Sequence, residues 1–343
     1  MTDAPQHLDA VPGSTRGYLI AVTATVIWSS TAIFIGYLTT RFQMPPLVLA
    51  FWRDLIVTAT LFGVIAVLAR PLLHLGRQNI AFFAVYGLLL ATFNALWTAS
   101  VKLNGAAVST VLAYSSPAFT ALAGWRWWGE RLDALKVGAV FLSIGGCVLV
   151  SGAYDPKVWQ LNPTGIVIGL LSGVGFAAYS IMGKFSSKRG TNPWTATLYT
   201  FAFGSLFLLL VQRPDTILWL SHPLREGGAA WREVVLGWGI IILLSIGPTI
   251  GGYGLYTVSL THLPAATANL IATLEPILTA ILAMLFLGEQ LAAIALIGGG
   301  MTLFGVVLLR LSDRAHQAQH RRGALRRVAA EPRQLADSPQ EPS

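Results

Sequence analysis

The stretch AAVSTVLAYSSPAFTALAGWRWWGERLDA, residues 106–134, recurs without a gap as AATANLIATLEPILTAILAMLFLGEQLAA, residues 265–293. At this constant offset of 159 residues, ten of the 29 aligned positions are identical, including Pro117 with Pro276. Both copies contain an apolar run of about 20 residues, which is the length that a helix needs to cross a bilayer. A duplicated membrane segment is typical of secondary transporters that consist of two structural repeats.

The composition of the chain is that of a membrane protein. Hydrophobic residues make up 54% of the 343 residues and charged residues 11%, whereas about a quarter of the residues in a soluble domain are charged. The single cysteine, Cys147, excludes both a disulfide within the chain and a zinc site made of cysteines. We therefore expect an all-α polytopic membrane protein.

Ten transmembrane helices are expected from the apolar stretches of the sequence. They cover residues 17–39, 46–69, 80–102, 105–128, 134–152, 163–184, 193–212, 234–258, 263–287 and 291–311. Pro46, and Pro163 and Pro193 after Asn162 and Asn192, mark helix starts, because a helix tolerates proline in its first turn. The glycines at 298–300 are assigned to close helix packing.

The distribution of Lys and Arg predicts a multi-pass protein of the cell membrane with both termini in the cytoplasm. The N-terminal tail, residues 1–16, lacks the apolar core of a signal peptide. The C-terminal tail, residues 312–343, is basic and disordered by this interpretation, and the arginine-rich segment 310–327 either contacts anionic lipids or is solvated. The loop 212–233 is expected at the headgroup level. Because these segments account for the net charge of +8, no nucleic-acid partner is expected.

The repeat predicts two inverted halves, residues 17–152 and 163–311, with five helices each. The two copies occupy the fourth and ninth apolar stretches, and an odd separation of five reverses the direction of crossing. Trp28 and Phe176 take corresponding places in the first helices of the two halves. Exchange of conformation between such halves gives alternating access to a substrate site near the midplane of the membrane. Alternatively, the duplication only builds a stable symmetric bundle.

Three short patterns resemble a known family. In each copy of the repeat, a proline precedes a Gly-Glu pair, at 129–130 and 288–289, by the same number of residues. In the second apolar stretch, Pro46 precedes the run Phe51-Trp52-Arg53. With these features the chain resembles the EamA group of the drug/metabolite transporter superfamily. The resemblance implies ten helices in two EamA repeats, and export of amino acids, metabolites or drugs, often driven by an ion or proton gradient.

Glu275 is the candidate coupling residue. An ionised carboxylate in the middle of a membrane span costs several kcal/mol unless it faces water or a partner, so a side chain that takes and releases a proton suits this place. The alternative is a structural Glu at a kink made by Pro276, whose ring frees the carbonyl of Ala272. The first copy has Ser116 at the position of Glu275, so any role of this carboxylate belongs to one half.

Prolines and glycines mark candidate hinges. Pro117, Pro248 and Pro276 are the candidate hinge or kink residues, and the run 247–254 predicts a hinge or a broken helix because its backbone groups need other partners. Small-residue packing is the alternative for that run. Arg53 either binds a substrate carboxylate or reaches the outer headgroups, and it need not pair with the adjacent Asp54.

A set of polar and aromatic residues is expected to line a substrate cavity, with rings as walls and amides or hydroxyls as orienting groups. The set consists of Asn94, Trp97, Tyr114, Ser116, Tyr179, Tyr253, Tyr256 and Asn269. Glu130 and Glu289, each after a glycine at the end of a helix, are interpreted as structural caps of the following helices.

No catalytic residues and no metal site are predicted, because the sequence lacks a phosphate loop, an HExxH motif and Cys/His metal spacing. The prediction is therefore a transporter and not an enzyme, without a cofactor, whose partners are a small-molecule substrate, membrane lipids and, as coupling ion, protons. The alternatives are an uncoupled facilitator and a membrane-embedded sensor or enzyme.

Overall fold

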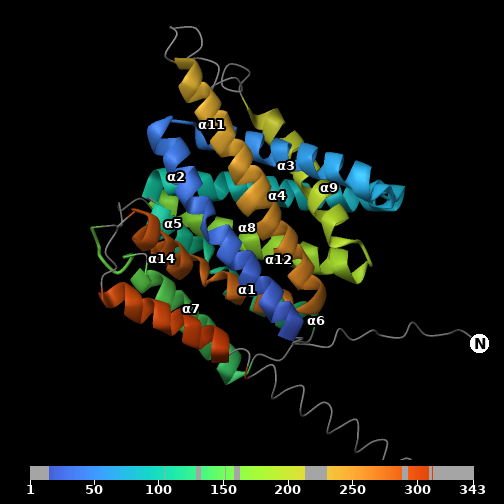
Figure 1. The fold of residues 1–343 in the computed structure, drawn as a ribbon. Helices are drawn as coiled ribbons and strands as arrows, with labels where there is room; N and C mark the ends of the chain where they lie inside the picture. The colour runs from blue at the N-terminus through green and yellow to red at the C-terminus, as the bar shows by residue number, and fades with distance from the viewer. Residues whose placement is uncertain are drawn as a thin grey trace, which may run out of the picture.

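The computed structural model describes residues 15–104, 106–128, 133–150, 152–157, 163–212, 230–287, 293–308 and 311, and this part of the chain is helical without strands (Figure 1). The first half contains α1 (Thr15–Ser29), α2 (Thr31–Arg41), α3 (Pro46–Leu68), η1 (Arg70–Leu73), α4 (Arg77–Asn104), α5 (Ala106–Ala113), α6 (Ser116–Trp128) and α7 (Ala134–Val150). The second half contains α8 (Pro163–Lys188), α9 (Pro193–Val211), α11 (Ala230–Leu244), η3 (Ser245–Ile250), α12 (Gly251–His262), α13 (Ala265–Ala272), α14 (Glu275–Leu287) and a last helix, Ala293–Leu308.

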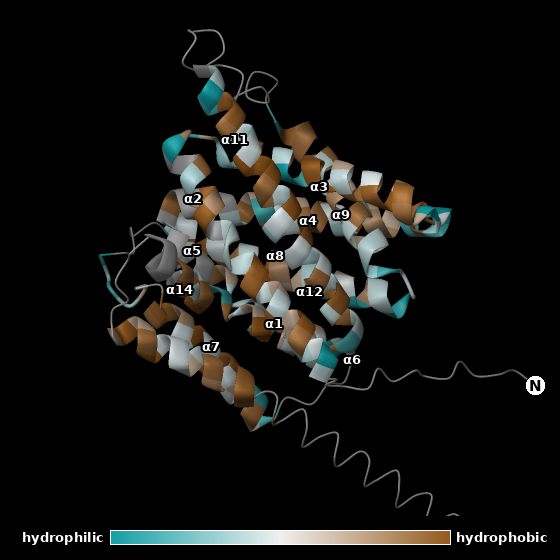
Figure 2. Cartoon of the chain, viewed as in Figure 1, coloured by the Kyte–Doolittle hydropathy of each residue, from teal (hydrophilic) through white to brown (hydrophobic). Residues whose placement is uncertain are grey.

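The outer surface is apolar, as in a protein that is solvated by lipid. Val67, Leu210 and Phe141 are each more than 70% exposed, and Figure 2 shows hydrophobic residues along the lengths of the helices, with hydrophilic residues mainly near their ends. In the described part of the chain, six helical stretches are long and apolar enough to span a membrane, and two shorter apolar helices accompany them. The chain is therefore a multi-pass membrane protein.

Helices occupy each of the ten stretches predicted from the sequence, and the number of crossings stays a prediction. The expected helix starts are confirmed, since α3, α8 and α9 begin at Pro46, Pro163 and Pro193. At the start of α9, the Asn192 side chain accepts a hydrogen bond from the backbone N–H of Trp194, at 2.9 Å. This bond satisfies one of the free N–H groups of the first turn.

The two halves are interlocked and do not lie side by side as separate bundles. In the first half, α1 packs against α12, α13 and α14 of the second half. In the second half, α8 packs against α4, α5 and α6 of the first half. The first helix of each half thus lies against the later helices of the other half, and one hydrophobic cluster contains residues of both halves, such as Trp28 and Phe176.

The repeated segment folds into the same interrupted helix twice. The bounds of α5 and α6 become those of α13 and α14 when 159 is added to each residue number. Between α13 and α14, tight turns join the backbone N–H groups of Thr273 and Leu274 to the carbonyls of Leu270 and Ile271, at 3.1 and 3.0 Å. Instead of the kinked helix expected from the sequence, the structure therefore has two helical segments.

The prolines explain these interruptions. Pro117 and Pro276 are the second residues of α6 and α14, where the missing N–H costs nothing. In a continuous helix, each proline ring would clash with the carbonyl four residues earlier. The chain avoids that clash by ending one helix and starting the next.

Pro248 is accommodated differently. It lies inside η3, a six-residue π-helical segment that continues directly into α12. The helix is therefore widened here. Of the two expectations for this run, the broken helix is wrong and the hinge stays a prediction. The widened turn relieves the clash of the ring with the carbonyl of Leu244. The Thr249 hydroxyl donates a hydrogen bond to that carbonyl, at 2.8 Å.

Glycines bring the last helix close to α7 and to α14. A Cβ on Gly298 would lie 2.7 Å from the carbonyl oxygen of Gly146 in α7, and a Cβ on Gly299 would lie 2.1 Å from Ile277 Cδ1 in α14. At Gly300, no described atom lies within 4 Å of such a Cβ. The assignment to close packing is thus confirmed for the first two glycines and wrong for the third.

Some predictions concern residues outside the described part of the chain. These are the proposed caps Glu130 and Glu289, both tails beyond residues 15 and 311, and most of the loop 212–233.

Candidate functional site

The two interrupted helices meet at their interruptions. Tyr114, which lies between α5 and α6, donates a hydrogen bond from its hydroxyl to Oε2 of Glu275, the first residue of α14. Ser116, the first residue of α6, donates a hydrogen bond to Oδ1 of Asn269 in α13, at 3.0 Å. Each copy of the repeat is therefore bonded to the other copy at the point where its helix is broken.

A chain of hydrogen bonds extends this contact to two further helices. Nδ2 of Asn269 donates to the hydroxyl of Ser180 in α8, at 3.2 Å. The Ser180 hydroxyl and the Tyr256 hydroxyl of α12 form a further hydrogen bond, at 2.7 Å. Asn269 and Ser180 are fully buried, so these bonds supply the partners that buried polar groups require. The chain of bonds joins α6, α13, α8 and α12.

An aromatic cluster lies beside these polar residues. The ring centroid of Trp28 in α1 is 4.4 Å from that of Tyr253 and 5.9 Å from that of Phe176. The Phe176 ring stacks on Tyr256, at 5.9 Å, and on Tyr179, at 6.2 Å. Trp28 and Phe176 are the corresponding residues of the two first helices. Their rings are in contact, so the first helices of the two halves meet in this cluster.

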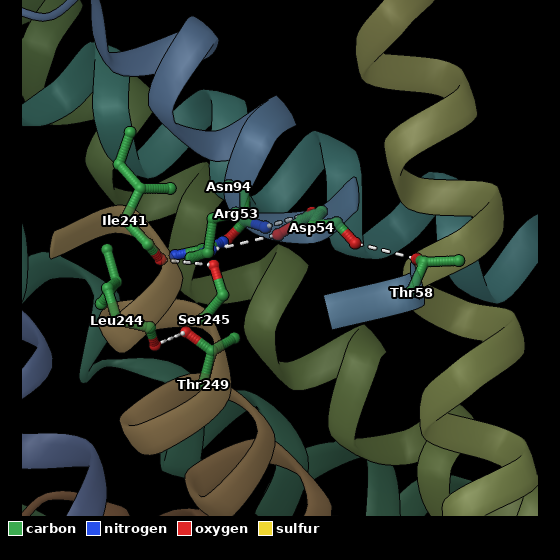
Figure 3. A network of polar contacts seen from close by, with 8 residues as sticks. All are labelled: Arg53, Asp54, Thr58, Asn94, Ile241, Leu244, Ser245 and Thr249. Atoms are coloured by element: carbon green, nitrogen blue, oxygen red, sulfur yellow. Dashed lines mark hydrogen bonds and ion pairs between the residues drawn. The ribbon is translucent and has the colours of Figure 1, made fainter. Parts of the chain in front are cut away.

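A second polar group surrounds Asp54 in α3 (Figure 3). Oδ1 of Asp54 accepts a hydrogen bond from Nε of Arg53, at 3.1 Å, and Oδ2 accepts one from Nδ2 of Asn94 in α4, at 3.4 Å. Asp54 is fully buried and Arg53 is 6% exposed. The two adjacent charges thus pair within the bundle. The expectation that they need not pair is wrong, and Arg53 does not reach outward to the headgroups.

Tyr253 belongs to the aromatic cluster. Its ring centroid lies 5.8 Å from that of Tyr179 and 5.1 Å from that of Phe201 in α9. It comes from the segment directly after η3.

The structure brings most of the predicted cavity residues together. Tyr114, Ser116, Tyr256 and Asn269 belong to the hydrogen-bonded contact around Glu275, Tyr179 and Tyr253 to the aromatic cluster, and Asn94 to the group around Asp54. Trp97 is only partly buried and packs at the edge of the core. All of the set except Trp97 are at most 5% exposed, so these side chains pack against one another in this conformation.

Sequence reasoning named Asp54 only as the neighbour of Arg53, and it missed Ser180. Asp54 carries a signal, because an acidic residue within an apolar stretch requires a partner. Ser180 carries none, since single serines are common in membrane helices and its role depends on Asn269 and Tyr256. Among the described residues, no group of three His, Cys, Asp or Glu side chains is placed to hold a metal ion.

Comparison with protein families gives a match to the family described as the EamA-like transporter family, over residues 15–152 and again over 163–311. An uncharacterized transporter of Archaeoglobus fulgidus is 27% identical over 72% of this chain and 82% of its own length. The threonine/homoserine exporter RhtA of Escherichia coli K12 is 28% identical over 63% of this chain and 66% of its own length.

The fold is similar to that of a solved structure. A protein crystal structure superposes with a TM-score of 0.67, over 88% of this chain and 99% of the other chain, at 18% sequence identity. At that identity the likeness concerns the fold alone.

Proposed function

The chain belongs to the EamA-like transporter family, and from this premise we propose that it is a secondary transporter that exports small organic metabolites by alternating access. The observation that carries the proposal is the contact between the two interrupted helices. The two copies of one segment are each interrupted near the middle. At the interruptions, Tyr114 donates a hydrogen bond to Glu275 and Ser116 donates one to Asn269.

We propose that ten transmembrane helices form two inverted halves, residues 17–152 and 163–311. The contacts between the fifth helix of each half support this arrangement. A Cβ on Gly305 would lie 2.8 Å from the carbonyl oxygen of Ala139, and one on Gly298 would lie 2.7 Å from that of Gly146. Later residues of α7 therefore contact earlier residues of the last helix. The two helices are antiparallel, as an inversion of one half relative to the other requires.

The proposed location is the cell membrane, with both termini in the cytoplasm. The support is the excess of Lys and Arg in the segments that this orientation assigns to the inside, including the C-terminal tail. Export is the proposed direction of transport, because the family resemblance implies it and because the relative RhtA is named an exporter.

The proposed coupling ion is the proton, and the proposed coupling residue is Glu275. It lies at a helix interruption, where the backbone is not held by continuous helical bonds. Its hydrogen-bond donor, Tyr114, comes from the other copy of the repeat. Protonation of the carboxylate would change this bond between the halves, and a change at that contact is what couples a proton to their relative movement.

One observation favours an uncoupled facilitator as the second candidate. Glu275 is the first residue of α14, where a carboxylate stabilises the helix N-terminus whether or not it exchanges protons. In that case, the bond to Tyr114 is structural, and transport follows the concentration gradient of the substrate alone.

Amino acids are the first substrates to test, because one relative is named a threonine/homoserine exporter. The purified protein would be reconstituted in liposomes with an imposed pH gradient and given labelled amino acids and cationic drugs. Wild type would be compared with Glu275→Gln, and with Ser116→Ala as the matched change in the other copy.

Proton coupling predicts that the pH gradient drives flux in wild type and in Ser116→Ala, and that Glu275→Gln loses this dependence. Substrate flux that changes neither with the pH gradient nor with the Glu275 substitution would identify a facilitator. If none of these compounds crosses the membrane in wild-type liposomes, the proposal of metabolite export fails.

A further inference from the structure

Arg53 has donor capacity that its surroundings do not use. A guanidinium carries five N–H donors in a rigid fork. Nε donates to Asp54 at 3.1 Å, but Nη2 is buried and has no hydrogen-bond partner among the described residues. Buried donors without acceptors are rare in folded proteins, because each one costs the free energy of its lost hydration.

Asp54 neutralises the charge of Arg53 without filling its fork. An Arg–carboxylate pair commonly has two parallel N–H···O bonds. Here, only Oδ1 of Asp54 accepts from Arg53, while Oδ2 accepts from Asn94 at 3.4 Å. The carboxylate is thus turned toward α4, and the buried Nη2 of the guanidinium is left without an acceptor among the described residues.

The segment that faces α3 on this side does not accept a hydrogen bond from Arg53 Nη2 either. Figure 3 shows Arg53 between α3 and the start of η3, and α3 and η3 are in contact. The hydroxyls of Ser245 and Thr249 donate to the carbonyls of Ile241 and Leu244 within their own helix, at 2.7 and 2.8 Å. These hydroxyls serve the backbone of the widened turn around Pro248.

We propose that Arg53 binds the carboxylate of the transported substrate, with Asp54 and Asn94 as positioning residues, and that the substrates are amphoteric molecules of the amino-acid type. A bound carboxylate would accept hydrogen bonds from the N–H groups of the guanidinium that Asp54 leaves without a partner. This inference rests on the proposed function, because the buried site is reached only if the halves change conformation.

The charges around the site favour an amphoteric substrate over a simple anion or a cationic drug. Arg53 and Asp54 together are neutral, so a carboxylate bound there brings one uncompensated negative charge. The ammonium group of an amino acid compensates it within the same molecule.

The experiment compares acids with their amides. Reconstituted wild type would be given the 20 labelled L-amino acids, and the best substrate would then be compared with its own L-amide, which keeps the ammonium and side chain and lacks the carboxylate. Cationic drugs serve as a third probe. We expect wild type to prefer the acid by about 100-fold, since a site that hydrogen-bonds a group rejects analogues without it.

Two variants separate recognition from folding. Arg53→Lys keeps the charge beside Asp54 but removes the fork, and Arg53→Gln with Asp54→Asn removes both charges, so no buried carboxylate is left unpaired. We expect the preference for the acid to fall about tenfold or more in both variants, while slow transport of the amide persists. A purely structural role of Arg53 would lower acid and amide transport together and leave their ratio unchanged.

Each outcome supports or overturns the inference. A collapse of the acid-to-amide ratio in both variants supports it. A ratio near one in wild type, or a wild-type protein that carries the drugs and no amino acid, overturns it while the transporter proposal stands. A wild-type protein that carries none of the probes contradicts both the inference and the proposed function.

Discussion

The two copies of the interrupted helix have the same backbone and different chemistry. The pairs α5–α6 and α13–α14 have the same bounds at an offset of 159 residues. At the first residue after the break, however, one copy has Ser116, which donates to the neutral Asn269, and the other has Glu275, which accepts from Tyr114. The duplication preserves where the helix breaks, and it lets the polar group at the break diverge.

The difference has a physical reason. The position of the break depends on Pro117 and Pro276, whose effect on the backbone is the same wherever proline stands. The polar group depends on what faces it across the interface, and the facing residues of two divergent copies differ. A symmetric scaffold can thus hold a single carboxylate, and the proton response that we propose for Glu275 belongs to one half alone.

The largest effects are expected where α7 and the last helix, the corresponding fifth helices of the two halves, are in closest contact. Gly146→Ala would place a Cβ 2.2 Å from Thr302 Oγ1 and 2.4 Å from the Gly298 carbonyl oxygen, and Gly298→Ala would place one 2.6 Å from Leu149 Cβ. We expect each substitution to destabilise the protein by about 3 kcal/mol through overpacking. The measurement is the thermal midpoint of the purified protein in detergent.

The matched controls are Gly138→Ala in α7 and Gly300→Ala in the last helix. A Cβ at either position has no described atom within 4 Å, and alanine is the better helix former. Thermal midpoints at or above that of wild type are expected for both. Equal stability of the controls and the two packed variants would contradict the close antiparallel contact of these helices.

Intermediate effects are expected at the breaks, where the two copies differ. Tyr114→Phe removes the donor to Glu275, and Ser116→Ala removes the donor to Asn269. Because hydrogen bonds to charged groups are worth about 1.5–3 kcal/mol and neutral ones about 1 kcal/mol, Tyr114→Phe should destabilise more. The comparison of thermal midpoints at neutral pH checks this order.

Glu275→Gln serves as the control for that comparison. Together with Tyr114→Phe, it should destabilise by less than the sum of the two single changes, since both act on one bond. Additive effects would mean that the tyrosine and the carboxylate do not interact in the folded protein. A larger effect of Ser116→Ala would reverse the proposed asymmetry between the copies.

The smallest effects are expected at the ends of the first helices of the two halves. Arg41, the last residue of α2, forms an exposed salt bridge with Glu233 at the start of α11, at 2.9 Å. Arg189, just after α8, lies over the Phe82 ring at the start of α4, with 4.2 Å between Cζ and the ring centroid. Each arginine thus reaches the start of a helix in the other half.

We expect Arg41→Ala and Arg189→Ala each to lower stability by about 1 kcal/mol or less. The contribution of Arg41 should shrink in high salt, because salt screens exposed ion pairs, and that of Arg189 should change less. Thermal midpoints at low and high ionic strength provide the measurement. A salt-independent loss in Arg41→Ala would indicate that this side chain acts through packing.

Much of the fold could be predicted from the sequence. Apolar stretches of the right length located the helices, and Pro46, Pro163 and Pro193 marked helix starts that the structure confirms. The repeat also located the interruptions, although a kink was expected. Sequence patterns could not distinguish a kink from a break, or predict the π-helical turn at Pro248, because these depend on how freed carbonyls find other donors, such as the Thr249 hydroxyl.

Less of the site could be predicted. Glu275 and its polar neighbours stood out as isolated polar residues in apolar stretches, but their partners did not. The pairing of Tyr114 with Glu275 joins residues 161 positions apart, and Ser180 joins the network only because Asn269 faces it. The neighbour relation of Arg53 and Asp54 was visible and still misjudged, since side-chain torsions can bring the charges of adjacent helix residues together when both are buried.

The sequence by itself determined the membrane class, the places of the helices and the existence of two related halves, because hydrophobic length, proline and duplication act locally along the chain. Only the tertiary structure decided that each half's first helix packs on the other half, that the two breaks meet, and that Arg53 keeps a buried donor without a partner among the described residues. These features depend on contacts between distant segments, where the free energy of a polar group is set by the neighbours that the fold supplies.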